Sequence, residues 1–296
     1  MYKKEPIMPL MITHRMRGFD KVESSIHGLK NALGSPFQGA EFDTRFSSDR
    51  RIFVNHDPDL VRFNGQRLLI SSCTSDQLTS LKHPSTEKSI PSLREMLEIA
   101  ATHKRTDFHI CIDIKEHGQE QQIVTAIQEF GLADRVIIFS WVPEALMTLH
   151  SLLPHVPLFF SYYPVSGWIK LLAMKARVQF TKIAGSLLRK PNKYSQVKPR
   201  FQQPGLPSHS DPDATIGFET EYYCTRLPEG MLSEALRNSG GGVCADYRLI
   251  DEAYSIACKQ EGFRLCIYGV KDNSVIKKIG SMQPDIILTD DPDLTK

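Results

Sequence analysis

The chain has 296 residues, of which 41% are hydrophobic and 24% are charged, and its formal net charge is +2. This composition is typical of a globular protein, and the length suits one α/β barrel or two smaller domains. The small net charge excludes a general electrostatic attraction to nucleic acid. We therefore expect no nucleic-acid partner, and a phosphate group would need a local binding site.

The N-terminal segment does not resemble a targeting sequence. Its apolar run is broken at Pro9 and reaches His14 too soon for a signal peptide. No stretch of about 18 uncharged apolar residues follows, which argues against a membrane-spanning helix. The six cysteines include no Cys-x-x-Cys pair, so a zinc knuckle or redox motif is not expected. These features together predict a cytoplasmic protein with reduced thiols.

Short β-like runs then alternate with longer helical runs along the chain. The expected strands are residues 10–14, 40–45, 52–55, 109–115, 136–140, 158–162, 242–247, 264–270 and 286–289. The expected helices are residues 25–33, 92–102, 120–130, 143–152, 168–188, 229–238 and 251–260. Such regular alternation indicates a parallel sheet whose strands are connected by helices.

The strand over 52–55 is close enough to the strand over 40–45 to be its hairpin partner, which leaves eight strands. Eight strands with intervening helices predict an α/β fold, a TIM (β/α)8 barrel that forms a single domain over residues 1–296. Residues 216–223 are a competing strand candidate, so the identity of the sixth barrel strand stays open.

Two segments interrupt the alternation. Residues 57–90 are polar and rich in serine, which predicts an insertion after the second strand, and residues 189–214 contain five prolines, which predict a surface loop. Residues 168–188 place apolar side chains on one helical face and basic side chains mostly off it. We expect an outer helix of the barrel there, with a peripheral membrane contact through residues 168–190 as the alternative.

Charged side chains occur inside two otherwise apolar strands. Glu41 and Asp43 are two residues apart, and so are Asp113 and Lys115, so each pair shares one face of its strand. Like charges inside a barrel are costly unless a cation neutralises them. The three carboxylates therefore predict one divalent cation, Mg²⁺ or Ca²⁺, because both ions prefer oxygen ligands.

Two histidines lie at the ends of predicted strands, where the catalytic residues of such barrels are found. His14 ends the first strand and is followed by Arg15, and His56 directly follows residues 52–55. Each histidine alone would most simply be structural. Together with the carboxylates they predict a general acid, a general base and two phosphate-binding cations, which are Arg15 and Lys115.

These motifs resemble those of the glycerophosphodiester phosphodiesterase family, which lies in the superfamily of phosphatidylinositol-specific phospholipase C-like phosphodiesterases. The matching segments are His14-Arg15, Glu23-Ser24-Ser25, Glu41-Phe42-Asp43, His56-Asp57, Ile90-Pro91-Ser92-Leu93, Asp113-Ile114-Lys115 and Thr289-Asp290-Asp291-Pro292. The resemblance therefore spans most of the chain. It is weakest between residues 162 and 245.

The resemblance implies that the chain hydrolyses glycerophosphodiesters to glycerol 3-phosphate and an alcohol. The chain departs from the family pattern at Met16-Arg17, which separate Arg15 from Gly18, and at Asp113, where most members have Glu. The sphingomyelinase D branch also has Asp there, so a phospholipase D-like enzyme acting on lysophospholipids or sphingolipids is an alternative. A catalytically inactive barrel that serves as a binding module is a third, which the intact set of candidate residues disfavours.

The same resemblance implies that His14 is the general base and His56 the general acid. We expect the acidic site to raise the pKa of the nearer histidine and the metal to lower the pKa of the other. The sequence does not choose between water and a hydroxyl of the substrate as the attacking group. It also leaves open the released alcohol and the oligomeric state.

Overall fold

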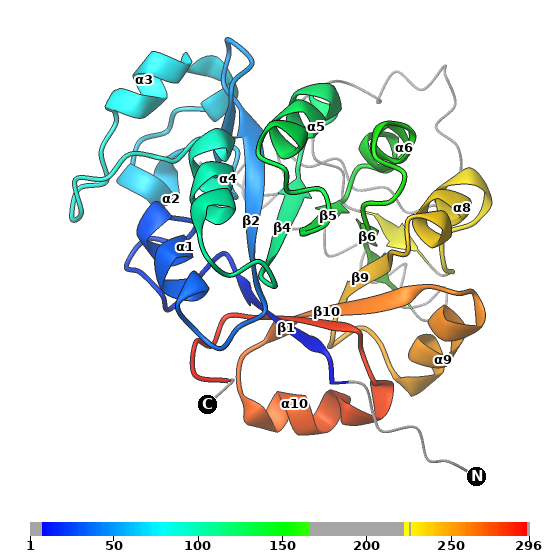
Figure 1. Cartoon of the computed structure of the whole chain (residues 1–296). Coiled ribbons are helices and arrows are strands. Elements are labelled where there is room, and N and C mark those ends of the chain that lie inside the picture. The colour runs from blue at the N-terminus through cyan, green and yellow to red at the C-terminus, as the bar shows by residue number, and fades with distance from the viewer. Residues whose placement is uncertain (1–7, 166–221, 225, 295–296) are drawn as a thin grey trace, which may run out of the picture.

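Eight parallel strands close into a barrel in the computed structural model, which describes residues 8–165, 222–224 and 226–294 (Figure 1). Around the barrel the strands are β1 (Leu10–His14), β2 (Gly39–Phe46), β4 (His109–Ile114), β5 (Val136–Ser140), β6 (Leu158–Ser161), β9 (Gly242–Asp246), β10 (Arg264–Val270) and β11 (Ile286–Thr289). The first strand pairs with both β2 and β11, which closes the sheet. The predicted TIM barrel is therefore confirmed.

The short strand β3 (Ile52–Val54) lies outside the barrel closure. It pairs antiparallel with the end of β2, with Thr44 opposite Val54 and Phe46 opposite Ile52. The predicted hairpin is thus confirmed. The sixth barrel strand is β9, which pairs with β6, whereas Tyr223–Cys224 forms β8 and pairs only with β7 (Tyr163–Pro164).

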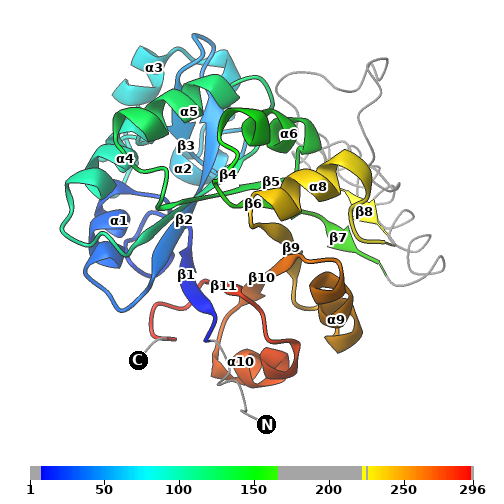
Figure 2. The ribbon, with the colours of Figure 1, turned by 45° about the vertical axis from the view of Figure 1, so that its right-hand side comes forward.

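Helices cover the outside of the barrel, one after another around the strands (Figure 2). They are α1 (Ile26–Leu33), α4 (Leu93–Thr102), α5 (Glu120–Glu129), α6 (Pro143–Leu152), α8 (Gly230–Asn238), α9 (Glu252–Gln260) and α10 (Asn273–Ile279). Ser92 shows why α4 begins where it does, because its hydroxyl accepts from the Glu95 amide while the Glu95 carboxylate accepts from the Ser92 amide. Of these helices, α10 was not predicted, since its short run of residues carries a weak apolar pattern.

The apolar core has two layers. The larger layer lies between the strands and the surrounding helices, and the smaller one fills the barrel interior with Ile12, Cys111, Ile137, Phe139, Phe159, Cys244, Cys266, Ile286 and Leu288. Strands such as β5 are buried along their whole length, which explains their nearly continuous apolar sequence. The six cysteines of the chain are buried, and none of them forms a disulfide.

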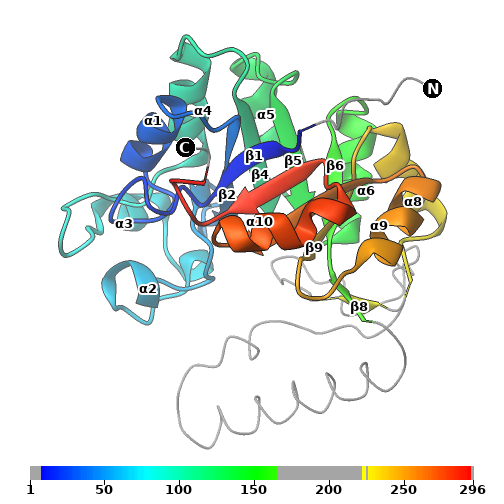
Figure 3. The ribbon, with the colours of Figure 1, turned by 90° about the horizontal axis from the view of Figure 1, so that it is seen from below.

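The segment over residues 57–90 forms a compact unit beside the end of β2. It contains α2 (Val61–Asn64), a short 3₁₀ turn (Ile70–Ser72) and α3 (Ser75–Ser80), packed around a separate apolar cluster of Phe53, Leu60, Phe63, Ile70, Cys73, Leu78 and Ile90. Figure 3 shows α2 and β8 on the same side of the barrel. Both follow the carboxyl ends of barrel strands, so the insertion stands at the face where (β/α)8 barrels bind ligands.

Several sequence predictions fall outside the described residues. These are the helix over 168–188 with its membrane contact through 168–190, the proline-rich loop over 189–214 and most of the competing strand over 216–223. Among the residues that the structure does describe, no helix is both long enough and apolar enough to cross a membrane.

Candidate active site

Three buried carboxylates meet inside the carboxyl end of the barrel. Glu41 and Asp43 come from alternate positions of β2, and Asp113 lies directly opposite Asp43 in the pairing of β2 with β4. One carboxylate oxygen from each residue lies within 4.8 Å of the others, and all three side chains are buried. An all-oxygen donor set of this kind suits a hard divalent cation such as Mg²⁺ or Ca²⁺.

The two predicted phosphate-binding cations face these carboxylates. Lys115 places its Nζ 2.9 Å from Asp43 Oδ1 and 2.6 Å from Asp113 Oδ2. Arg15 places its Nε 3.1 Å from Asp43 Oδ2, and its backbone amide donates to Glu41 Oε2 at 3.1 Å. The structure therefore brings positive and negative groups together at the ends of three strands, as alternating side-chain direction requires.

With all five groups ionised, the three carboxylates and two cations leave a formal charge of −1. Burial raises the pKa of Glu41 well above its ordinary value, and the neighbouring Asp43 and Asp113 raise it further. Burial acts the same way on Asp43, but Lys115 and then Arg15 outweigh it and hold the pKa of Asp43 well below its ordinary value. Arg15 and Lys115 thus stabilise the ionised form of Asp43 much more than that of Glu41. The donor set therefore fits an added divalent ion, which would stabilise ionised Glu41.

His14 ends β1 at the edge of the carboxylate group. Its Nδ1 is hydrogen-bonded to Asp290 Oδ1 at 2.7 Å, and its Nε2 lies 3.9 Å from Glu41 Oε2. Burial and, to a smaller extent, the charge of Arg15 lower the pKa of His14 to about 4, against the opposing effect of Asp290. The imidazole is therefore neutral at neutral pH, with Nε2 directed toward the carboxylates.

His56 follows β3 and is held by contacts at both its side chain and its backbone. Its Nδ1 is hydrogen-bonded to Asp57 Oδ1 at 2.7 Å, and its carbonyl accepts from Arg45 Nε at 3.1 Å. Burial lowers the pKa of His56 as well, despite the opposing charge of Asp43. The expectation that the carboxylates would raise the pKa of one histidine is therefore wrong, because burial dominates at both.

The turn after β1 has an unusual backbone. Arg15 and Met16 both have positive φ angles, 56° and 51°, and Gly18 has a φ of 79°. A β-carbon added to Gly18 would lie 2.5 Å from Cγ of Pro292, so a glycine is required there. Met16 and Arg17, which depart from the family pattern, lie in this turn, and the turn places Arg17 at the site.

Besides Arg45, five charged residues that sequence reasoning did not assign to the site contact the candidate residues or one another there: Arg17, Glu23, Asp57, Arg62 and Asp290. Asp57 and Asp290 each lie in a segment that resembles the family pattern, and so does Glu23. Those matches could have assigned the three carboxylates to the site from the sequence alone. No local pattern marks Arg17 or Arg62, because each has one partner that is distant in the sequence.

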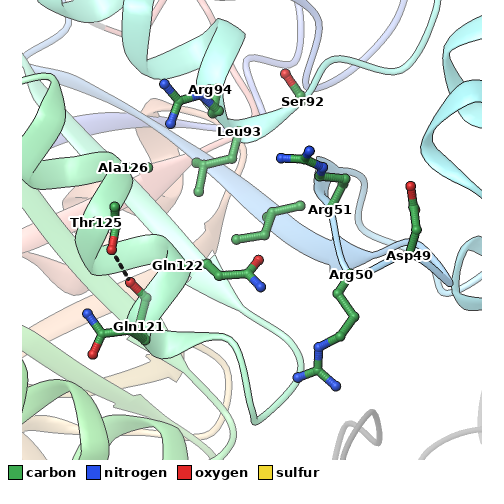
Figure 4. A pocket seen from close by; sticks show the side chains of 11 residues that line it. Asp49, Arg50, Arg51, Ser92, Leu93, Arg94, Gln121, Gln122, Thr125 and Ala126 are labelled. Carbon is green, nitrogen blue, oxygen red and sulfur yellow. Dashed lines mark hydrogen bonds between the residues drawn. The ribbon is translucent and has the colours of Figure 1, made fainter.

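A separate cavity lies outside the barrel, between the turn after β2 and the helices α4 and α5 (Figure 4). Its lining comprises residues 49–52, 92–94, 121–122 and 125–126, so none of the seven candidate residues contributes to it. Two of its three arginines are engaged elsewhere, since Arg50 donates to the Gly118 carbonyl and Arg94 pairs with Glu129. This cavity offers no reactive group comparable to the histidines and carboxylates.

Comparison with known proteins identifies the group of relatives. A "glycerophosphodiester phosphodiesterase" from Bacillus altitudinis is 29% identical over 162 residues, which are 51% of this chain and 65% of that protein, so the match spans less than two thirds of the relative. A lysophospholipase D from Mus musculus is 22% identical over 193 residues, covering 61% of this chain and 57% of that protein.

The solved structures show the same fold. A phosphodiesterase from Oleispira antarctica, solved in complex with the product sn-glycerol-3-phosphate, matches with a TM-score of 0.62 at 17% identity and covers 96% of this chain and 94% of its own.

The model of the glycerophosphoryl diester phosphodiesterase family matches residues 13–198, which include all seven candidate residues. The chain therefore belongs to the glycerophosphoryl diester phosphodiesterase family.

Proposed function

We propose that this chain is a metal-dependent phosphodiesterase that hydrolyses glycerophosphodiesters to glycerol 3-phosphate and an alcohol. The observation that carries the proposal is the convergence of two carboxylate-bound histidines on one buried group of three carboxylates and two cations. The Oleispira antarctica phosphodiesterase, which has this fold, binds sn-glycerol-3-phosphate as product, and this supports the same product here.

Glu41, Asp43 and Asp113 would hold the divalent cation. When bound, the cation would neutralise charge on the phosphate oxygens as the reaction proceeds. Arg15 and Lys115 lie beside the same carboxylates and would bind phosphate oxygens, Arg15 through two nitrogens and Lys115 as a point charge. An inactive binding module would not need both histidines beside these groups, so the geometry favours an enzyme.

His14 and His56 would transfer the protons. His14 would take a proton from the oxygen that attacks phosphorus, and its lowered pKa suits a base that starts neutral. His56 would give a proton to the alcohol oxygen as the bond from phosphorus to that oxygen breaks, and the bound anionic diester would favour its charged form. In each dyad the carboxylate holds Nδ1, which leaves Nε2 for the proton transfer.

The experiment compares glycerophosphocholine with a nitrophenyl phosphodiester of glycerol, using wild type, His14→Ala and His56→Ala with added Mg²⁺ or Ca²⁺. We expect both variants to lose most activity on glycerophosphocholine. His56→Ala should recover on the nitrophenyl ester, because that leaving group needs no proton, whereas His14→Ala should not. Equal responses of the two variants would overturn the acid and base roles, and full activity in EDTA would overturn the metal.

A second candidate substrate is a lysophospholipid. Val61, Leu68 and Leu69 are exposed apolar residues of the segment that also contains Asp57 and Arg62, which belong to the site. Apolar side chains beside the site would suit an acyl chain, whereas a glycerophosphodiester without one gains nothing from them. The lysophospholipase D from Mus musculus among the relatives supports the same possibility.

The two substrates are separated by comparing glycerophosphocholine and lysophosphatidylcholine in wild type and in Leu68→Asp/Leu69→Asp. If lysophospholipids are substrates, the double variant should raise KM for lysophosphatidylcholine alone. Turnover of glycerophosphocholine only, or equal effects on both substrates, would reject the second candidate.

A further inference from the structure

A continuous series of charged contacts connects the two histidines. It starts at His14 Nδ1 and runs through Asp290 (2.7 Å), Arg17 (2.9 Å), Glu23 (2.8 Å), Arg62 (3.2 Å) and Asp57 (3.2 Å) to His56 Nδ1 (2.7 Å). Between the two histidines, negative and positive groups alternate along the series. Every step is therefore attractive when the arginines and carboxylates carry their ordinary charges.

The middle of this series, formed by Arg17, Glu23 and Arg62, is here termed the charged bridge. Each arginine uses two different nitrogens, Nε and Nη1, for two different carboxylates. Three of these four contacts are hydrogen bonds, which fix direction as well as distance, and the contact of Arg62 with Asp57 is an ion pair.

Glu23 is the centre of the bridge. Burial would raise the pKa of its carboxyl group, but Arg15, Arg17 and Arg62 outweigh burial and lower it. Glu23 is therefore ionised at neutral pH and can accept from both arginines of the bridge.

The bridge adds charged contacts between the turn after β1 and the insertion, which are also joined by the ion pair of Lys88 with Asp20 at 3.2 Å. Arg17 and Glu23 belong to the turn between β1 and α1, and Arg62 belongs to α2 of the insertion. Asp290 follows the last strand and Asp57 follows His56. Each histidine's own carboxylate fixes only the orientation of that ring. His14 is fixed on β1, so the spacing between the two rings depends on the segment after β3 that carries His56, whose carbonyl also accepts from Arg45.

We propose that Arg17, Glu23 and Arg62 are positioning residues that couple the two histidine–carboxylate pairs, so that both imidazoles are aligned with the phosphodiester at the same time. The inference rests on the proposed function, in which the histidines transfer the two protons. Displacement at phosphorus requires the attacking and leaving oxygens to lie roughly in line, so it is sensitive to the relative position of base and acid.

The test measures kcat and KM for glycerophosphocholine with added divalent metal in Arg17→Met, Arg62→Met and the double variant. Each single change should lower kcat by about tenfold to hundredfold while KM changes little, because alignment rather than substrate affinity is lost. The melting temperature should change by no more than about 4 °C, since partly exposed ion pairs contribute little to stability. An increase in KM at unchanged kcat would instead assign the arginines to substrate binding and overturn the proposal.

The double variant distinguishes a connected bridge from two independent arginines. Breaking the bridge at either end already disconnects the histidines, so the double variant should lose about as much kcat as the worse single variant. A loss equal to the product of the single losses would contradict the coupling. Arg67→Met is the matched control, because Arg67 is an exposed arginine of the same insertion that takes no part in the series, and it should keep wild-type kinetics.

Failure of this inference differs from failure of the proposed function. His14→Ala and His56→Ala are measured under the same conditions. If these variants keep normal activity, the two-histidine mechanism itself is wrong. If they are inactive while Arg17→Met and Arg62→Met match the wild type, the mechanism stands and only the bridge is rejected.

Discussion

The interior of the barrel has two levels with opposite chemistry, although both are built by the same strands. On β4, Cys111 lies in an apolar layer, and two residues later Asp113 lies among charged groups. On β1, Ile12 and His14 make the same change. A shift of two residues along a strand keeps the side chain on the same face, so distance from the carboxyl end alone separates the two levels.

The two levels make opposite contributions to the stability of the fold. The apolar level stabilises the fold through burial and close packing, as in the stacked rings of Phe139 and Phe159, whose centroids are 5.1 Å apart. The charged level holds Glu41 and Asp43 away from water, which is costly even with counter-ions nearby. We therefore expect substitutions in the charged level to affect catalysis first and substitutions in the apolar level to affect stability first.

The largest effect is expected for Asp43→Asn in the charged level. Asp43 contacts both Arg15 and Lys115 and is one of the three proposed metal ligands, so turnover and metal binding should be lost. The far-ultraviolet circular dichroism spectrum should stay that of the wild type. Isothermal titration with Mg²⁺ or Ca²⁺ measures the binding, and retained activity at wild-type metal affinity would contradict the assignment.

Phe159→Ala tests the apolar level. Phe159 is fully buried in the barrel interior, so the substitution should lower the free energy of unfolding by about 3–5 kcal/mol, measured by urea denaturation. The kcat per folded molecule should fall much less than in Asp43→Asn. Ile256→Ala on the exposed face of α9 is the control and should leave stability nearly unchanged. Complete loss of kcat in the folded Phe159→Ala variant would break the proposed separation between the levels.

Lys115→Met returns to the charged level with a smaller expected effect. Loss of one cation should lower kcat/KM by about tenfold to thousandfold, because charge on the phosphate in the transition state loses one stabilising group. Steady-state kinetics on glycerophosphocholine give the value. Lys259→Met, on the exposed surface of α9, should be neutral. Wild-type kinetics in Lys115→Met would make Lys115 a purely structural residue.

The smallest effect is expected at His117, which lies just beyond the charged level and is one third exposed. A hydrogen bond from Nδ1 to Glu120 at 2.9 Å raises the pKa of His117 above 6.5. A raised folded-state pKa stabilises the protein fully below pH 6.5, and this contribution is lost as the pH rises through the folded-state value. Glu120 behaves oppositely, since its pKa is lowered from 4.5, even though burial opposes the hydrogen bond from His117.

His117→Gln should therefore reduce the melting temperature most between pH 4.5 and 6.5, the ordinary pKa values of the two groups. The accompanying decrease in the free energy of unfolding should be at most about 1 kcal/mol, because solvent screens the partly exposed pair of His117 and Glu120. Thermal unfolding followed at pH 5.5 and pH 8.5 measures the difference. A loss that is as large at pH 8.5 as at pH 5.5 would show that the charge of His117 is not the cause.

Nine of the eleven strands that the structure describes, including the two of the hairpin, were predictable because β-branched and apolar runs report local backbone preference and burial. The alternation of Glu41 with Asp43, and of Asp113 with Lys115, likewise predicted shared faces, and the register that sets Asp43 opposite Asp113 brings those faces together. By contrast, α10 was missed, and the pKa of the histidines was predicted in the wrong direction for one of them. Burial decides that pKa, and burial depends on the whole chain.

The sequence by itself determined which residues share a strand face and which strands end in reactive side chains, because side-chain direction repeats every two residues along a strand. Only the tertiary structure decided that Asp290 holds His14, 276 residues away, and that Arg17 and Arg62 meet at Glu23. Closure of the barrel brings the first and last strands together, and the path of the insertion sets Arg62 beside the first turn. Neither follows from local pattern, since contacts between distant segments arise only when the whole fold is formed.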